Sequence, residues 1–274
     1  MAELIIVFRE VLESSLIVGI LYTYLIKTKQ KDKVVNLWQG VILAIFLSGI
    51  GSVVFQVLVG GFKGQAEKIF EGIVMIIASF VLGTMIVWMA KNRNISDDLK
   101  NKADMALSNN RAKYGIFALA FISVFREGIE TILFLYGVMI QQGSLSISSS
   151  LFGAFLGVSI GILIFVQGRR VPLKIFFNVS SIILIFVSAG MFAYGIHELE
   201  SAGIIKDYGR AWDINPQINL DGSYPLFHDK GYIGSLIKGL FGYNGDPSYI
   251  ELICWVSVLS GLGYLWNTFK TQEN

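Results

Sequence analysis

Cysteine and charged residues are scarce in this sequence of 274 residues, and each shortage excludes a class of protein. Cys254 is the only cysteine, so an intramolecular disulfide is excluded; it lies in an apolar run, where a small buried side chain is expected. Only 15% of the residues are charged, whereas a soluble domain has about 25%. Since 54% of the residues are hydrophobic and the mean hydropathy is +0.61, the composition predicts a polytopic membrane protein.

The N-terminus also lacks the basic segment of a cleavable signal peptide. Met1-Ala2-Glu3 carries no basic side chain, and the first apolar run contains arginine and glutamate. We therefore expect this run to remain in the mature protein as a membrane helix.

Apolar stretches that can cross about 30 Å of hydrocarbon occur along the whole chain. They are Leu4–Ile26, Val35–Phe62, Ile69–Ala90, Tyr114–Ile140, Ser148–Val166, Leu173–His197 and Tyr249–Phe269. The sequence therefore predicts an all-α fold with about seven transmembrane helices. In the fifth stretch, Gly153, Gly157 and Gly161 recur every fourth residue, which predicts close packing against another helix.

Basic loops alternate with loops of little net charge. The fourth loop, 141–147, has no charge at all, and the second sets Lys63 and Lys68 beside Glu67. The positive-inside rule then predicts a multi-pass protein of the cytoplasmic membrane with its N-terminus outside and its C-terminus in the cytoplasm. The first, third and fifth loops are the basic ones. They contain Lys27, Lys29, Lys31, Lys33, Lys91, Arg93, Lys100, Lys102, Arg111, Lys113, Arg169, Arg170 and Lys174.

The expected organisation has five parts. They are a first three-helix repeat at 1–90, a cytoplasmic linker at 91–113, a second three-helix repeat at 114–197, an extracytoplasmic loop at 198–248, and a seventh helix with a cytoplasmic tail at 249–274. We expect the linker to be a helix or a hinge, and we expect a short surface or re-entrant helix at Gly231–Phe241. The outer loop also offers scattered groups for a weak docking surface: Asp207, Asp213, Asp221, His228 and Asp229.

A charged motif, R-E-x-x-E, occurs twice within apolar stretches and follows a phenylalanine each time. The copies are Arg9-Glu10-Val11-Leu12-Glu13 and Arg126-Glu127-Gly128-Ile129-Glu130. One ionisable side chain at the centre of a membrane helix costs about 2.5–3.5 kcal/mol. Six of them in a repeated pattern therefore indicate a function.

Each copy lies in the first helix of a three-helix group, which predicts an inverted repeat around a midplane site. At 1.5 Å per residue, the first copy lies about 15 Å and the second about 18 Å from the outer end of its helix. The two copies are therefore expected at one level. The copies differ at the first x position of the motif, which is Val11 in the first copy and Gly128 in the second. We expect the first copy to pack more loosely for this reason.

The spacing places the arginine and both glutamates of a copy within about 100° of one helix face. Glu10, Glu13, Glu127 and Glu130 would then supply oxygen ligands, which suit hard cations such as Fe³⁺, Mg²⁺, Ca²⁺ or Mn²⁺. Arg9 and Arg126 would keep the carboxylates ionised and oriented until the ion replaces them. The alternative is a structural ion-pair network, which two symmetric copies make less attractive than one copy would.

Paired R-E-x-x-E motifs in the first and fourth helices resemble the oxidase-dependent iron permeases, which include bacterial EfeU-type permeases and the fungal high-affinity iron permease. The resemblance covers nearly the whole chain. It includes Phe70-Glu71-Gly72, Trp88-Met89, His197-Glu198-Leu199, Leu240-Phe241-Gly242-Tyr243 and Asp246-Pro247-Ser248.

This resemblance implies a transporter rather than an enzyme, with iron (Fe³⁺ or Fe²⁺) as transported substrate and no permanently bound cofactor. The motif glutamates would be the iron ligands. The implied partners are an extracytoplasmic iron-binding protein and a ferroxidase or peroxidase, and no nucleic acid.

Several acids near the outer helix ends are candidates for the path by which the ion reaches the site. They are Glu71 in the third helix, and His197, Glu198 and Glu200 at the end of the sixth. The alternative for the three residues of the sixth helix is that they only form a helix end exposed to solvent. Glu251 follows Ser248 by three residues and is expected to stabilise the N-terminus of the seventh helix.

Three rival functions fit the same residues. The first is transport of another hard divalent cation, such as manganese or magnesium, because carboxylates alone do not set the radius of the ion. The second is a non-transporting membrane scaffold of a redox complex, in which the ion pairs hold helices together. The third is a proton-coupled exporter.

Overall fold

The fold was examined in a computed structural model, which describes residues 2–91, 95–107, 112–167, 173–215, 224–229 and 231–271. Within these ranges the regular structure is helical, with one isolated bridge between Arg210 and Ser248. The all-α class is therefore confirmed. The loop residues Arg93, Arg111, Arg169, Arg170 and Asp221 lie outside the described residues.

The long helices coincide with the apolar stretches of the sequence. One difference is that α2 ends at Val59, because Gly60 and Gly61 form a turn before Phe62. The linker contains a helix, α4, and the outer loop contains the short helix that the sequence predicts, α8. The elements are α1 (Ala2–Lys27), η1 (Lys31–Lys33), α2 (Val34–Val59), α3 (Gln65–Lys91), α4 (Ile95–Leu107), α5 (Ala112–Gln142), α6 (Ile147–Gln167), α7 (Leu173–Ser201), α8 (Tyr232–Phe241) and α9 (Tyr249–Thr271).

Five of the helices in the described part of the chain, α2, α3, α6, α7 and α9, are long and apolar enough to span a membrane. With 26 and 31 residues, α1 and α5 also exceed the length needed to span, but these are the helices that carry the charged motif. In hydrocarbon a backbone must satisfy its own polar groups, which a helix does within one segment. The architecture is accordingly that of a multi-pass membrane protein.

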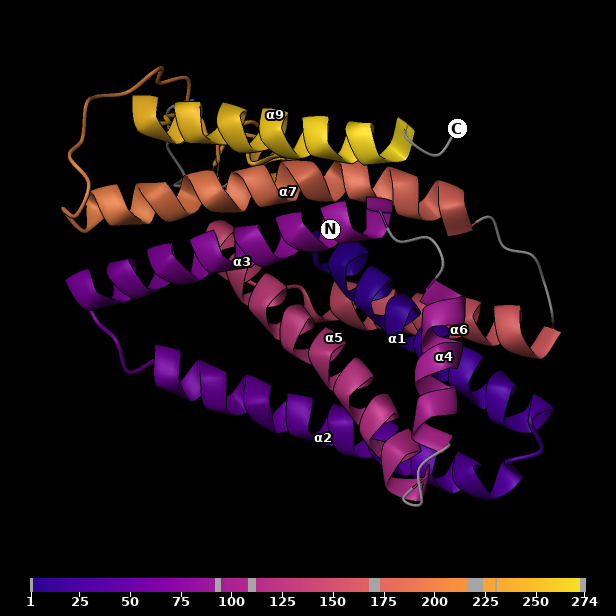
Figure 1. The fold of residues 1–274 in the computed structure, drawn as a ribbon. Coiled ribbons are helices and arrows are strands. Elements are labelled where there is room, and N and C mark those ends of the chain that lie inside the picture. The colour runs from indigo at the N-terminus through magenta and orange to yellow at the C-terminus, as the bar shows by residue number, and fades with distance from the viewer. Residues whose placement is uncertain are drawn as a thin grey trace.

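The long helices pack in pairs that join distant parts of the sequence. α1 lies along α6, α2 along α5, and α3 along α7. Figure 1 shows α3, α7 and α9 side by side, with α5 crossing at an angle beneath them. α1 also packs against α5, so the two motif-bearing helices are in contact.

Buried apolar side chains form two clusters, and each cluster takes residues from both α1 and α5. The motif copies, at residues 9–13 and 126–130, lie between the clusters along both helices. The first cluster includes Ala2 and Ile6 of α1 with Phe134 and Val138 of α5, and the second includes Leu21 and Leu25 of α1 with Ile116, Ala120 and Val124 of α5. The charged residues are therefore enclosed by apolar packing at both ends.

Candidate metal-binding site

Glycines on α6 let this helix approach the motif region of α1. A β-carbon on Gly157 would lie 3.0 Å from the Phe8 carbonyl oxygen and 3.0 Å from the Leu12 amide nitrogen. Gly153 and Gly161 face α1 just as closely, which confirms the packing predicted from their spacing. The backbone around the first motif copy is thus held directly by α6.

The first x position of the motif, Val11 or Gly128, is packed tightly in both copies. Val11 faces Gly157, whose missing side chain leaves room for the valine. In the second copy the sizes are reversed, because a β-carbon on Gly128 would overlap the Ser48 side chain of α2. The expectation that the first copy packs more loosely was therefore wrong, since the opposing helix compensates for the larger side chain.

Three motif carboxylates from the two helices converge on one point. Glu10 of α1 and Glu127 and Glu130 of α5 each offer an oxygen, and these oxygens lie within 4.8 Å of one another. The three side chains are buried, with 1%, 5% and 8% of their surface exposed. We refer to them as the carboxylate cluster.

Each residue of this cluster also has an oxygen without a hydrogen-bond partner. Within the described residues, Oε2 of Glu10, of Glu127 and of Glu130 are buried and accept no hydrogen bond. A buried polar group without a partner costs free energy, and a buried carboxylate costs most when it is ionised. A cation bound by the carboxylate cluster would compensate the buried charge and would satisfy the ligand preference of a hard ion.

The two arginines bind the second glutamate of their own motif copy. Arg9 Nε donates to Glu13 Oε1 at 2.8 Å, and Arg126 Nε donates to Glu130 Oε1 at 2.7 Å. Glu13 is not one of the three clustered carboxylates, whereas Glu130, which is bound to its arginine in the same way, is. The sequence analysis expects all four glutamates in one site. Its carboxylate is held beside the cluster by Arg9.

Both arginines also contact α3, a helix without a copy of the motif. Arg9 Nη2 lies 2.6 Å from the Met89 sulfur, and the Arg126 guanidinium lies 5.8 Å from the centre of the Trp88 ring. The sequence offered only a weak signal, the dipeptide Trp88-Met89 at the end of the third apolar stretch. These two consecutive residues thus contact the arginines of different motif copies.

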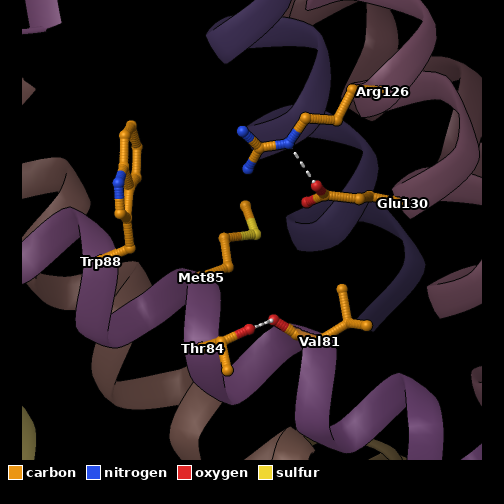
Figure 2. A pocket seen from close by; sticks show the side chains of 6 residues that line it. All are labelled: Val81, Thr84, Met85, Trp88, Arg126 and Glu130. Atoms are coloured by element: carbon orange, nitrogen blue, oxygen red, sulfur yellow. Dashed lines mark hydrogen bonds and ion pairs between the residues drawn. The ribbon is translucent and has the colours of Figure 1, made fainter.

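A pocket of about 230 Å³ opens beside the second arginine. Figure 2 shows Trp88 and Met85 of α3 facing the Arg126–Glu130 ion pair of α5 across this pocket. Val81 and Thr84 complete its lining. Glu130 is the residue that belongs both to the carboxylate cluster and to the pocket wall.

The chain is similar to known proteins along nearly its whole length. Residues 1–271 match the iron permease FTR1 family. The chain belongs to this family. A ferrous iron permease EfeU of Escherichia coli O6:H1 is 32% identical over 255 residues, which cover 92% of this chain and 89% of the relative.

Two further relatives span similar shares. An uncharacterized protein of Archaeoglobus fulgidus is 32% identical over 267 residues, covering 96% of this chain and 92% of the relative. The ferrous iron permease EfeU of Yersinia pestis is 28% identical over 251 residues, covering 90% and 86%. No solved structure is significantly similar to the chain. Family membership makes this a membrane protein of iron transport, which confirms the resemblance noted in the sequence.

The candidate residues for the ion path lie away from the carboxylate cluster, where α3 meets the C-terminal end of α7. They are Glu71, His197, Glu198 and Glu200. Glu71 of α3 lies close enough to Glu198 of α7 for the two carboxylates to repel each other. Glu198 is itself hydrogen-bonded to Tyr194. Oε1 of Glu200 is buried and has no hydrogen-bond partner.

His197 joins this region to α9 through Glu251. Its Nδ1 lies 3.4 Å from Glu251 Oε2. Glu251 also forms a capping box with Ser248: the Glu251 amide donates to Ser248 Oγ at 3.1 Å, and the Ser248 amide donates to Glu251 Oε2 at 3.4 Å. The S-x-x-E pattern in the sequence is the signal for this cap, and it agrees with the predicted role of Glu251.

A further buried glutamate, Glu3, was not singled out in the sequence. It is 2% exposed at the start of α1, and its Oε1 accepts a hydrogen bond from the Ser146 amide at 3.2 Å. This bond links α1 to the turn before α6. Glu3 is therefore a structural carboxylate outside the carboxylate cluster.

Proposed function

We propose that this protein imports iron across the cytoplasmic membrane through the carboxylate cluster. The observation that carries the proposal is the convergence of Glu10, Glu127 and Glu130 within 4.8 Å, each buried and each with an unpartnered oxygen. The residues come from two helices that are far apart in sequence. A purely structural network would pair these oxygens, whereas a transport site needs them free for its cargo.

Charge balance favours a multivalent cation at this position. If all six motif residues are ionised, four carboxylates and two guanidiniums leave a net charge of −2. A divalent or trivalent ion largely neutralises this charge, and carboxylate oxygens suit hard ions. Glu13, which Arg9 holds beside the cluster through Oε1, would offer its other carboxylate oxygen as a fourth ligand.

The proposed topology has seven spans, with α1–α3 and α5–α7 as inverted repeats and α9 as the additional helix. The packing supports this arrangement, because the first helix of each repeat lies along the second helix of the other: α1 along α6, and α5 along α2. The third helices, α3 and α7, lie along each other. In this proposal the N-terminus is outside, and the linker 91–113 and the tail that follows the seventh helix face the cytoplasm.

In the same proposal, Glu71, His197, Glu198 and Glu200 guide the ion from the outer surface toward the cluster. Intramembrane acids commonly mark ion paths. The outer loop, 198–248, would face an extracytoplasmic iron-binding protein and a ferroxidase or peroxidase. Since relatives are named ferrous iron permeases, Fe²⁺ is the first species to test.

The test is uptake of radioactive iron into proteoliposomes that contain the wild type, Glu10→Gln or Glu130→Gln. Glutamine keeps the size and removes the charge, so we expect uptake to fall by at least about tenfold, since even an outer-shell change costs a metal site that much. Glu3→Gln is the matched control, because Glu3 is a buried glutamate of α1 outside the cluster. Unfolding temperatures of all variants are measured in parallel.

The rivals predict other outcomes. Transport of manganese or magnesium predicts that these ions, added in excess, abolish iron uptake and are themselves accumulated by the wild type. A structural scaffold predicts that Glu10→Gln and Glu130→Gln lower the unfolding temperature while the wild type moves no iron. Uptake that persists in both variants would show that the ion takes another path.

A further inference from the structure

The two motif arginines occupy different environments. The Arg9 side chain has no exposed surface, and its guanidinium contacts Glu13 and Met89. The Arg126 side chain is 53% exposed, and its guanidinium lies between Glu130 and the ring of Trp88. Arg9 therefore has no room to move, whereas Arg126 borders the pocket between α3 and α5 (Figure 2).

Glu130 connects this pocket to the carboxylate cluster through its two oxygens. Oε1 accepts the hydrogen bond from Arg126, and Oε2 is buried without a partner. A cation in the cluster attracts both oxygens of Glu130 and repels the guanidinium. This repulsion weakens the ion pair between Arg126 and Glu130, and the Trp88 ring, 5.8 Å from the guanidinium, offers a surface that stabilises a cation.

We propose that Arg126 is the counter-ion that exchanges with the cargo, that Trp88 holds it while the ion is bound, and that the ion is released through this pocket. Arg9 stays in place and keeps Glu13 oriented throughout. This inference rests on the proposed function, because it assigns the release side of the same site.

The position of the pocket on α3 supports release toward the cytoplasm. Trp88 is three residues from the end of α3 at Lys91, or about 4.5 Å along the helix axis. Glu71, the candidate on the outer path, is near the opposite end of the same helix. In the proposed topology the ion therefore meets Glu71, the carboxylate cluster and the pocket in this order.

Side-specific labelling tests the pocket directly. Cys254 is the only cysteine, so Cys254→Ser gives a background in which Thr84→Cys can be modified alone. We expect a membrane-impermeant maleimide to modify Thr84→Cys from the cytoplasmic face of sealed vesicles and not from the outer face. Phe80→Cys is the matched control, because Phe80 lies one turn away on α3, is 72% exposed and is not part of the pocket wall. It should react from neither face.

The same labelling separates failure of this inference from failure of the proposed function. Each cysteine variant is first assayed for iron uptake, and an inactive wild type overturns the proposed function. If uptake is normal but Thr84→Cys reacts from the outer face, or from neither face, the pocket is not the release route and the inference is overturned.

Substitution of Trp88 tests the exchange itself. Trp88→Leu should weaken equilibrium binding of Fe²⁺ by about fivefold, because the displaced guanidinium loses its cation–π partner, and Trp88→Phe should restore most of the affinity. Phe80→Leu, which changes an exposed aromatic residue of the same helix outside the pocket wall, should leave this affinity within about twofold. Equal effects at the two positions, or no effect of Trp88→Leu in a folded protein, would contradict the role of Arg126.

Discussion

The two copies of the motif have the same charged residues and yet differ in what surrounds them. In the first, Arg9 is fully buried and bonded to Glu13; in the second, Arg126 is about half exposed and bonded to Glu130. The difference comes from α3, a single helix that serves both copies with consecutive residues, Met89 for Arg9 and Trp88 for Arg126. A repeated sequence therefore gives one buried arginine and one half-exposed arginine.

The copies also show how a size difference within a motif is compensated. Val11 is opposite Gly157, and Gly128 is opposite Ser48. In both places the combined volume of the two facing side chains is small enough for the helices to make close contact. The variants below test these differences, beginning with the largest expected effect.

Substitution of the arginines should reveal the largest difference in stability between the two motif copies. Arg9→Ala leaves the Glu13 carboxylate in a largely buried position without its partner, which should lower the free energy of unfolding by about 3–5 kcal/mol. Arg126→Ala also leaves a buried carboxylate, Glu130, without its partner, but the guanidinium that it removes is half exposed, so it should cost less, about 1–3 kcal/mol. Chemical unfolding in detergent measures both. Equal losses would mean that the two arginines share one environment.

Exchange of the packing residues should have an intermediate effect. Gly157→Val forces a side chain against Val11 and the α1 backbone, and it should cost about 1–3 kcal/mol of stability. Val11→Gly in the same chain should recover part of this loss, because it vacates the space. A double-mutant cycle of unfolding free energies measures the coupling, for which we expect at least about 0.5 kcal/mol.

The same cycle in the second copy provides the comparison. Gly128→Val should lower the stability because the valine side chain overlaps Ser48, and Ser48→Gly should recover part of this loss by removing the overlap. Additive effects in either cycle would contradict the complementary packing at that copy.

Loss of the sulfur contact to Arg9 should have the smallest effect. Met89→Leu keeps the volume of the side chain and removes the acceptor for Arg9 Nη2, which should lower the free energy of unfolding by about 0.5–1.5 kcal/mol. Met85→Leu is the control, because Met85 is buried on α3 and lines the pocket beside Arg126. A larger loss at Met85 than at Met89 would show that shape, not the contact with Arg9, decides stability here.

Much of this arrangement follows from local sequence. The apolar stretches form helices because a backbone in hydrocarbon must satisfy its hydrogen bonds internally. The spacing of Arg9 and Glu13, and of Arg126 and Glu130, is one helical turn, so each pair forms its ion pair within its own helix. Likewise, Ser248 and Glu251 form their cap within one turn. These features depend on residues at most four positions apart.

What depends on distant residues required the tertiary structure. The sequence nominates four glutamates equally, but the structure brings Glu10, Glu127 and Glu130 together and leaves Glu13 with Arg9. The choice depends on the angle and distance at which α1 meets α5, which glycines on α6 and small residues on α2 set from elsewhere in the chain. The sequence by itself thus determined the helices, the motif and the family. Only packing between helices decided which carboxylates converge and which arginine is accessible, because a periodic pattern marks the face of a helix that packs but not the distant segment that it packs against.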